Sequence, residues 1–197
     1  MPYLKTIVKY INEALSDTVL KDKRFQKSNI IEIAQALPRK NGKNLEYLPS
    51  YVDNDGEAKY VGVDDDYDLI IYHKINSIDV SKATVNRGFG DGTGYQGNIA
   101  RMSMIVFGRR DKLKLTNDDL SLYLQSNIPE AATKDLLVEL QFQAANININ
   151  SIVLNDLQVF QEEYPGFEFF LKPEQFLFKI NYTIESAYLK RCFNNCK

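Results

Sequence analysis

The sequence has few cysteines and histidines, the residues that form disulfides and zinc sites. Its two cysteines are Cys192 and Cys196, and its one histidine is His73. Two neighbouring cysteines do not make a disulfide framework, and a zinc site of cysteine and histidine would need further ligands. We therefore expect two reduced thiols in a cytoplasmic protein, with no bound metal and no other cofactor.

The sequence also lacks a strong charge imbalance and a long apolar run. Its formal net charge is -2 at pH 7, which gives no general positive field for nucleic acid or an anionic membrane. No segment approaches the roughly 18 consecutive apolar residues of a membrane-spanning helix. The first residues, "MPYLKTIVKYINEAL", are amphipathic and lack the uninterrupted apolar segment of a signal peptide. We expect no membrane partner.

The sequence does contain enough apolar side chains for one core. Of its 197 residues 44% are hydrophobic, and these include 12 Tyr and 11 Phe. This composition suits a single domain over residues 1–197. One stretch, "PRKNGKNLEYLPSYVDNDG", is polar and rich in turn residues. We predict that it forms a polar arm or long connection at about residues 38–60.

An amphipathic helix is predicted at the N-terminal end of the chain. Its apolar residues recur at three- and four-residue steps and therefore share one face. They are Leu4, Ile7, Val8, Ile11 and Leu15. Pro2 suits the first turn, and we expect Asp17 and Thr18 just past the end. The next segment, "NIIEIAQALP", fits a strand and a short helix equally well, so its structure stays open.

The central segments alternate with the two-residue period of strands. In "YDLIIYHKINSI" one face carries Leu69, Ile71, His73 and Ile75, and the other carries Ile70, Tyr72 and Lys74. In "IARMSMIVFG" the residues Met102, Met104 and Val106 alternate with Arg101, Ser103 and Ile105. A shorter strand is predicted in "AKYVGV".

Two further helices are predicted from residues that can cap them. Thr116 can cap one helix, with Asp119 at the third position of a capping-box-like arrangement, and Pro129 limits its end. Asn155 can cap a short helix that ends before Pro165. Further strands are predicted over residues 136–149, 167–171 and 175–185. The order of elements favours an α+β fold: a mainly antiparallel sheet, helices packed on one face, and a long hairpin loop.

That loop is "NRGFGDGTGYQGN", between the two central strands. It holds five of the ten glycines of the chain: Gly88, Gly90, Gly92, Gly94 and Gly97. Residues 92–97 satisfy G-x-G-x-x-G. In a dinucleotide-binding fold this motif opens a helix, whereas here a strand is predicted to follow it. The other motifs of kinases and the G-K-[ST] of P-loops are missing from the sequence.

We therefore expect the glycine-rich stretch to be a flexible hairpin tip that contacts another protein chain. Glycines at this density cannot pack a core, but they allow the backbone to approach another surface closely. Phe89 and Tyr95 would supply two aromatic anchors.

Three other features could carry chemistry, and each has a simpler interpretation. Asp53, Asp55, Asp64, Asp65, Asp66 and Asp68 are potential cation ligands, but their spacing does not match a calcium loop, and adjacent aspartates usually lie on solvated turns. Arg109, Arg110, Lys112 and Lys114 could contact a phosphate backbone or an acidic partner, and they fit a solvated loop or an intersubunit salt-bridge edge equally well. His73 is expected to be half-buried with its hydrogen bonds satisfied. We predict no catalytic residue.

The order of these segments resembles a family of phage proteins. Five segments in this order are similar to the core of tail-terminator and head–tail joining (neck ring) proteins of tailed bacteriophages. They are "YDLIIYHKINSI", the glycine-rich stretch, "MSMIVFG", "TNDDLSLYLQSNIP" and the late "FLFKINYTIE". The resemblance covers roughly residues 60–130 and the last thirty. Segments 38–60 and 130–165 are additional to the smallest members.

The resemblance implies a structural protein without catalytic residues. It implies a homo-oligomeric ring in the virion, assembled in the cytoplasm of the host bacterium. The ring would contact neighbouring neck, portal or tail proteins, and DNA would pass through it without sequence-specific contacts. Two alternatives stay open. One is a monomeric or dimeric adaptor domain of a mobile element. The other is an enzyme with a deep pocket that gathers the carboxylates of residues 64–68 with His73 or Arg109.

Overall fold

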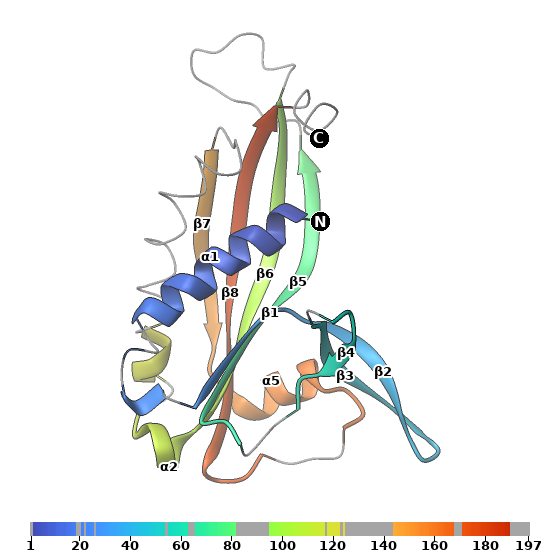
Figure 1. The fold of residues 1–197 in the computed structure, drawn as a ribbon, viewed down its shortest axis with the longest axis vertical. Coiled ribbons are helices and arrows are strands. Elements are labelled where there is room, and N and C mark those ends of the chain that lie inside the picture. The colour runs from blue at the N-terminus through green and yellow to red at the C-terminus, as the bar shows by residue number, and fades with distance from the viewer. Residues whose placement is uncertain are drawn as a thin grey trace.

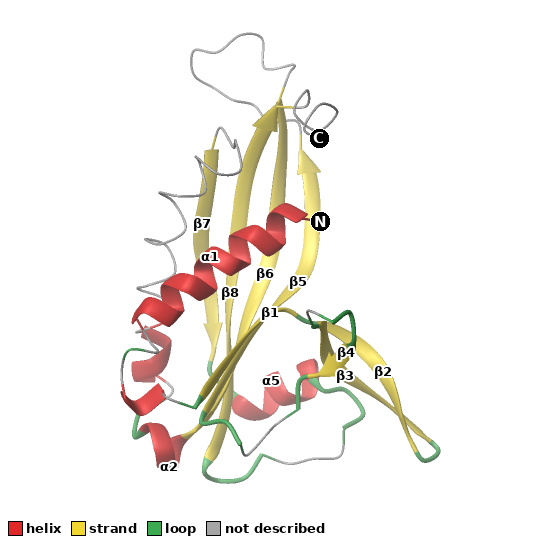
Figure 2. Ribbon diagram, in the orientation of Figure 1, coloured by secondary structure: helices red, strands yellow, loops and turns green. Residues whose placement is uncertain are grey.

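The computed structural model describes residues 2–18, 21, 23–25, 27–53, 55–62, 66–81, 95–116, 118–122, 124, 144–167 and 171–189. They form an α+β fold with two sheets, as the sequence predicts (Figures 1 and 2). The larger sheet has the strand order β1 (Ser28–Ile33), β5 (Leu69–Ser81), β6 (Tyr95–Arg109), β8 (Gln175–Leu189) and β7 (Ala144–Val153). The smaller sheet has the order β2 (Gln35–Asn41), β3 (Asn44–Val52) and β4 (Ala58–Tyr60). The described helices include α1 (Pro2–Thr18), the 3-10 turn η1 (Lys23–Phe25), α2 (Arg110–Leu113) and α5 (Asp156–Glu163).

Three long strands, β5, β6 and β8, form the centre of the larger sheet (Figure 1). β5 pairs with β6 from Leu69 opposite Gly108 to Ser81 opposite Gly97. All neighbouring strands in this sheet are antiparallel except β1, which runs parallel to β5. The mainly antiparallel sheet is therefore confirmed, with β1 and β7 as its two edges.

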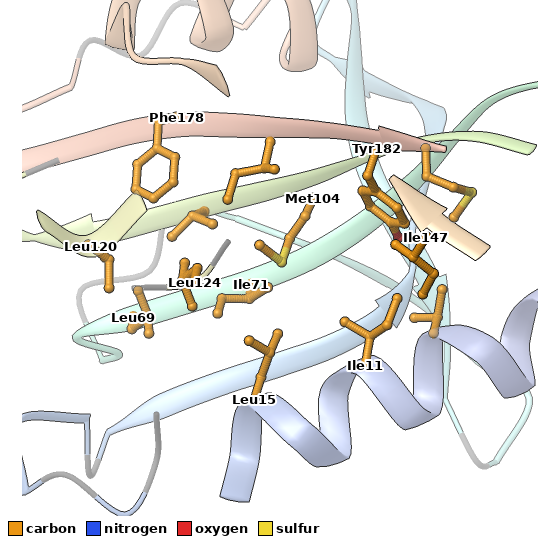
Figure 3. Packing of buried hydrophobic residues seen from close by; sticks show 14 of the residues in the cluster. Ile11, Leu15, Leu69, Ile71, Met104, Leu120, Leu124, Ile147, Phe178 and Tyr182 are labelled. Atoms are coloured by element: carbon orange, nitrogen blue, oxygen red, sulfur yellow. The ribbon is translucent and has the colours of Figure 1, made fainter. Parts of the chain in front are cut away.

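Helix α1 lies across one face of the larger sheet and buries the predicted apolar stripe. All five residues of that stripe are fully buried. Figure 3 shows Ile11 and Leu15 pointing from α1 toward sheet residues that include Ile71 and Tyr182. Burial of each such side chain contributes about 1.5–3 kcal/mol, so the stripe fixes the helix on the sheet.

The end of α1 differs from the prediction. Asp17 and Thr18 belong to the helix instead of lying past it. Neither residue breaks a helix, and Leu15 holds the last turn on the sheet. Asp17 also pairs with Lys21 four residues later, at 3.6 Å. Sequence reasoning placed the end too early because it gave these polar residues more weight than the packing of the last turn.

The opposite face of the larger sheet is also covered, so the prediction of helices on one face only is wrong. Side chains of β5, β6 and β8 form a second core with α5 and the smaller sheet. Its buried members include Ile70, Tyr72, Ile105, Phe107, Leu177, Leu48, Val159, Phe160 and Tyr164. These strands are apolar on both faces over part of their length, and both faces therefore need a cover.

Beyond α5 the same face becomes polar. Lys74 of β5 donates to Glu163 in the last turn of α5 at 2.9 Å. Further along, a series of side-chain hydrogen bonds crosses the sheet. Asn76 of β5 donates to Ser103 of β6 at 2.8 Å, and Ser103 donates to Asn181 of β8 at 2.6 Å. Asn181 in turn donates to Ser151 of β7 at 3.0 Å. The pairing of β5 and of β7 is irregular at this level. These contacts mark the point where the second core ends.

Residues 38–60, for which a polar arm or long connection was predicted, contain regular strands. β2 and β3 pair from Gln35 opposite Ser50 to Asn41 opposite Asn44. The two residues between them include Gly42, whose φ of 60° suits the first central position of a type II′ hairpin turn. The prolines and asparagines of this stretch suggested irregular turns. The tight turn and the alternating side chains of β3 instead make this stretch a hairpin. The tip of the hairpin extends away from the rest of the protein (Figure 2).

The structure also tests the segment whose structure was left open, two helix caps and the later strands. The segment whose structure was left open forms β1 and the start of β2. Both predicted caps are present: the side-chain oxygen of Thr116 accepts from the Asp119 amide at 3.1 Å, and that of Asn155 accepts from the Gln158 amide at 3.0 Å. Of the predicted strands, residues 136–143 and 168–170 lie outside the described residues. No helix in the described part of the chain is long and apolar enough to span a membrane.

Candidate functional site

The most distinctive surface feature is the β2–β3 hairpin, which is anchored at its base. The amide of Tyr47 in β3 donates to the carbonyl of Pro165 at 3.0 Å, and the amide of Val61 donates to the carbonyl of Pro49 at 2.7 Å. Leu48 inserts into the second core from the same strand. The loop that follows α5 therefore lies along the edge of β3 and holds the lower part of the hairpin in place.

Gly166 makes this close contact possible, and its replacement by alanine is expected to destabilise the protein by about 2 kcal/mol. Gly166 has a φ of 78°, and a Cβ atom there would lie 2.9 Å from the carbonyl oxygen of Leu45. The matched control is Gly56→Ala, because Gly56 has a φ of 83° and open space around it. We expect the control to cost about 1 kcal/mol in urea unfolding. Equal losses in the two variants would show that the contact with Leu45 has no effect.

A buried carboxylate stiffens the upper part of the hairpin. Glu46 is 3% exposed and accepts from Asn41 at 2.5 Å and from Arg39 at 2.8 Å. The hydrogen bond from Asn41 and then that from Arg39 hold the pKa of Glu46 below its usual value. The Arg39 guanidinium also lies over the rings of Tyr60 and Phe167, at 5.8 and 5.7 Å. These contacts fix β2 and β3 to each other almost to the turn.

The projecting hairpin carries apolar side chains that face solvent. Leu45 and Tyr47 alternate along β3 and are 49% and 40% exposed. On the other face of the hairpin, Leu37 of β2 is 37% exposed. Single exposed apolar residues are common on protein surfaces, but a rigid projection that carries several of them is typical of a contact surface.

A groove of about 500 Å³ runs along β1 beside the base of this hairpin. Residues 29–33, which are consecutive in β1, all line it. Since side chains of a strand alternate between its faces, a groove that touches five residues in a row follows the strand edge. Leu37 and Val52 from the smaller sheet and Lys5 from α1 complete the walls.

The glycine-rich stretch can be placed only in part. Gly88, Phe89, Gly90, Gly92 and Gly94 lie outside the described residues. Tyr95 and Gly97 belong to β6, so a strand begins inside the G-x-G-x-x-G motif. The prediction that a strand, and no helix, follows the motif is therefore confirmed. The antiparallel pairing of β5 with β6 also confirms that the stretch joins two neighbouring strands.

The basic residues at the end of β6 and just after it are largely paired within the chain. Arg109 donates to Asp111 at 3.0 Å, and Lys112 lies 3.9 Å from the same carboxylate. Arg110 donates to Asp156 at the start of α5, at 2.5 Å, and lies 5.8 Å from the centre of the Phe176 ring. Lys114 follows α2 and is exposed. This region thus fastens α2 to α5, and its role as a charged contact stays a prediction.

His73 is fully buried, where a half-buried residue was predicted. Its Nε2 lies 2.9 Å from Oδ1 of Asn12, and its Nδ1 lies 2.8 Å from the hydroxyl of Tyr182. The amide group of Asn12 donates to the carbonyl of Ile31, so its Oδ1 must accept from His73. His73 therefore carries its proton on Nε2 and accepts from Tyr182. Burial lowers the pKa of His73 to about 3, so the ring is neutral near pH 7.

The described aspartates do not gather around one site. Asp53 pairs with Lys59 at 2.6 Å and accepts from the amides of Asp55 and Glu57, and these contacts lower its pKa. Asp64 and Asp65 lie outside the described residues. Within the part of the chain that is described, no group of three histidine, cysteine or acidic residues could hold a metal ion.

No protein-family model matches this chain, and no curated protein is similar to it.

Proposed function

We propose that this chain is a structural subunit that assembles with copies of itself into a ring at the head–tail junction of a tailed bacteriophage. The ring would join the portal or connector to the tail and surround the DNA channel. The observation that carries the proposal is the β2–β3 hairpin, a projection that presents the exposed Leu45 and Tyr47 to a partner surface.

Rigidity of this hairpin favours assembly. Glu46 and its partners fix the two strands before any partner binds, so little conformational entropy is lost when the hairpin docks. In a ring, a projection on one side of each subunit meets a different surface on the next subunit. Contacts of this head-to-tail kind generate rings when the rotation closes.

The placement at a phage head–tail junction rests on the resemblance in the order of elements. In this role the protein has no catalytic task, and its partners are its own copies and the neighbouring neck, portal or tail proteins. The net charge of -2 supports passage of DNA, because a strongly basic channel would hold DNA through counterion release. Its site of action would be the virion, after assembly in the host cytoplasm.

Replacement of Leu45 by aspartate tests the proposed role of the hairpin. We expect the variant to fold with unchanged thermal stability, because Leu45 is exposed, and to self-associate about 30-fold more weakly, as for an interface residue worth about 2 kcal/mol. Analytical ultracentrifugation over a concentration series gives the association constants.

Leu157→Asp is the control, because Leu157 is also exposed and lies on α5, away from the hairpin. It is expected to assemble like the parent chain. If the Leu45 variant assembles as well as the control, the hairpin is not the contact surface.

A further inference from the structure

We propose that the groove along β1 receives the tip of the β2–β3 hairpin from a second copy of this chain. The inference rests on the proposed function and adds to it the two surfaces that meet. The hairpin of one subunit would lie in the groove of the next subunit, and the hairpin of that second subunit would lie in the groove of a third.

The edge of β1 is suited to bind an extended segment. β1 pairs with β5 on one side and is the last strand of the larger sheet on the other. The groove follows this edge over residues 29–33, within which the carbonyl of Ile31 accepts from Asn12 of α1. An edge strand offers backbone donors and acceptors to an added strand, and β2, the outer strand of the hairpin, can supply them in return.

Apolar side chains are present on both surfaces. Ile30 and Ile33 of β1 are partly buried in the groove, and Val52 at its wall is 64% exposed. The hairpin brings the exposed Leu45 close to its tip. Contact between these side chains would remove apolar area from water on both partners, which favours association.

The charges of the two surfaces are complementary. Lys40 and Lys43 are exposed beside the turn of the hairpin. The groove itself carries the exposed Glu32 on β1 and the exposed Lys5 on α1, and its Asp53 is paired with Lys59. The excess of negative charge lies beside the groove, where Asp55 and Glu57 are exposed on the β3–β4 turn just after Val52. Positive side chains on the tip would therefore approach negative ones at the groove, which aligns the partners and speeds their encounter.

The hairpin cannot fill the groove of its own chain. Gln35 and Leu37, at the base of β2, form part of the groove wall, and from there β2 leads away to the turn. At about 3.3 Å per residue, a strand of 7 residues places the tip roughly 23 Å from that base. Since tip and groove are separate surfaces, each subunit can receive one hairpin and place its own hairpin in the groove of a third subunit, and such a series forms a ring when the rotation closes.

Site-directed cross-linking tests this contact. Cys192 and Cys196 are the only cysteines, so a chain with both replaced by serine accepts single cysteines elsewhere. One chain carries Lys43→Cys at the tip, and the other carries Gln35→Cys at the groove. Both positions are exposed. The two chains are assembled together, treated with a short bis-maleimide and analysed by denaturing gel and mass spectrometry.

The control mixture combines Lys43→Cys with Asn148→Cys, because Asn148 is exposed on β7 at the opposite edge of the sheet. We expect the tip–groove mixture to give about tenfold more cross-linked heterodimer than the control, since a docked pair is held at high effective concentration. Oligomers that form without this cross-link, or that cross-link tip to tip, would overturn the inference and leave the proposed ring intact. A chain that stays monomeric would overturn both.

Discussion

Replacement of Gly108 by alanine is expected to destabilise the protein by about 3 kcal/mol, because the site has no room for a methyl group. Gly108 in β6 faces Phe176 in β8. A Cβ atom on Gly108 would lie 2.3 Å from Cζ of the Phe176 ring and 2.8 Å from Cε1. Distances this short require the ring or the backbone to move.

The Phe176 ring is not free to move aside. It is fully buried and stacks on Phe178 with 5.9 Å between ring centres. The Arg110 guanidinium, which is paired with Asp156, lies 5.8 Å from the centre of the same ring. Overpacking usually costs about 1–3 kcal/mol of stability. We expect a cost at the upper end of this range, because β6 and β8 are central strands and the Phe176 ring is enclosed.

Thermal unfolding measures this loss. A change of about 3 kcal/mol in a chain of this size lowers Tm by about 6–12 °C. The control is Gly62→Ala, because a methyl group on Gly62 would have no other atom within 4 Å, and its φ is not positive. The control should stay within about 1 kcal/mol of the parent protein. A Gly108 variant as stable as the control would mean that the sheet adjusts without cost.

The second large effect is a loss of stability in mild acid that depends on His73. We expect the free energy of unfolding to fall by about 2 kcal/mol between pH 6.5 and pH 5. The ordinary pKa of histidine is 6.5, and burial lowers that of His73 to about 3. Between these values the unfolded chain binds a proton that the folded chain does not bind. Stability is therefore complete above pH 6.5 and is lost as the pH falls toward 3.

This effect can be assigned to one residue, because His73 is the only histidine. Carboxylates with an ordinary pKa of about 4.5 or below titrate mainly under pH 5, outside the chosen window. Urea unfolding at several pH values gives the profile, and His73→Gln is the comparison because glutamine can donate and accept without titrating. The variant should show a flat profile over this window. Parallel profiles for the two proteins would show that His73 does not carry the effect.

The central part of the fold was predictable because its pattern is regular. The stripe of α1 and the alternation in β5 and β6 follow from the 3.6- and two-residue periods, and the caps at Thr116 and Asn155 follow from residue type. The cover on the second face was missed, although the same alternation places Ile70 and Tyr72 there. A sheet that is apolar on both faces needs two covers, and this signal could have located α5.

The candidate site was less predictable, because its key features are long-range. The polar composition of residues 38–60 concealed a hairpin whose register depends on one tight turn and on contacts with a loop more than a hundred residues later in the chain. The groove combines α1, β1 and the smaller sheet, and no local pattern indicates that these elements meet. The tight Gly42 turn between alternating residues was the one available signal.

The central claim is that the chain forms a closed ring of identical subunits, and native mass measurement combined with electron microscopy of the purified protein tests it most directly. We predict particles whose mass is a whole-number multiple of the 22.6 kDa chain and whose images are annular. A single species of 22.6 kDa at high protein concentration, with no annular particles, would contradict the account.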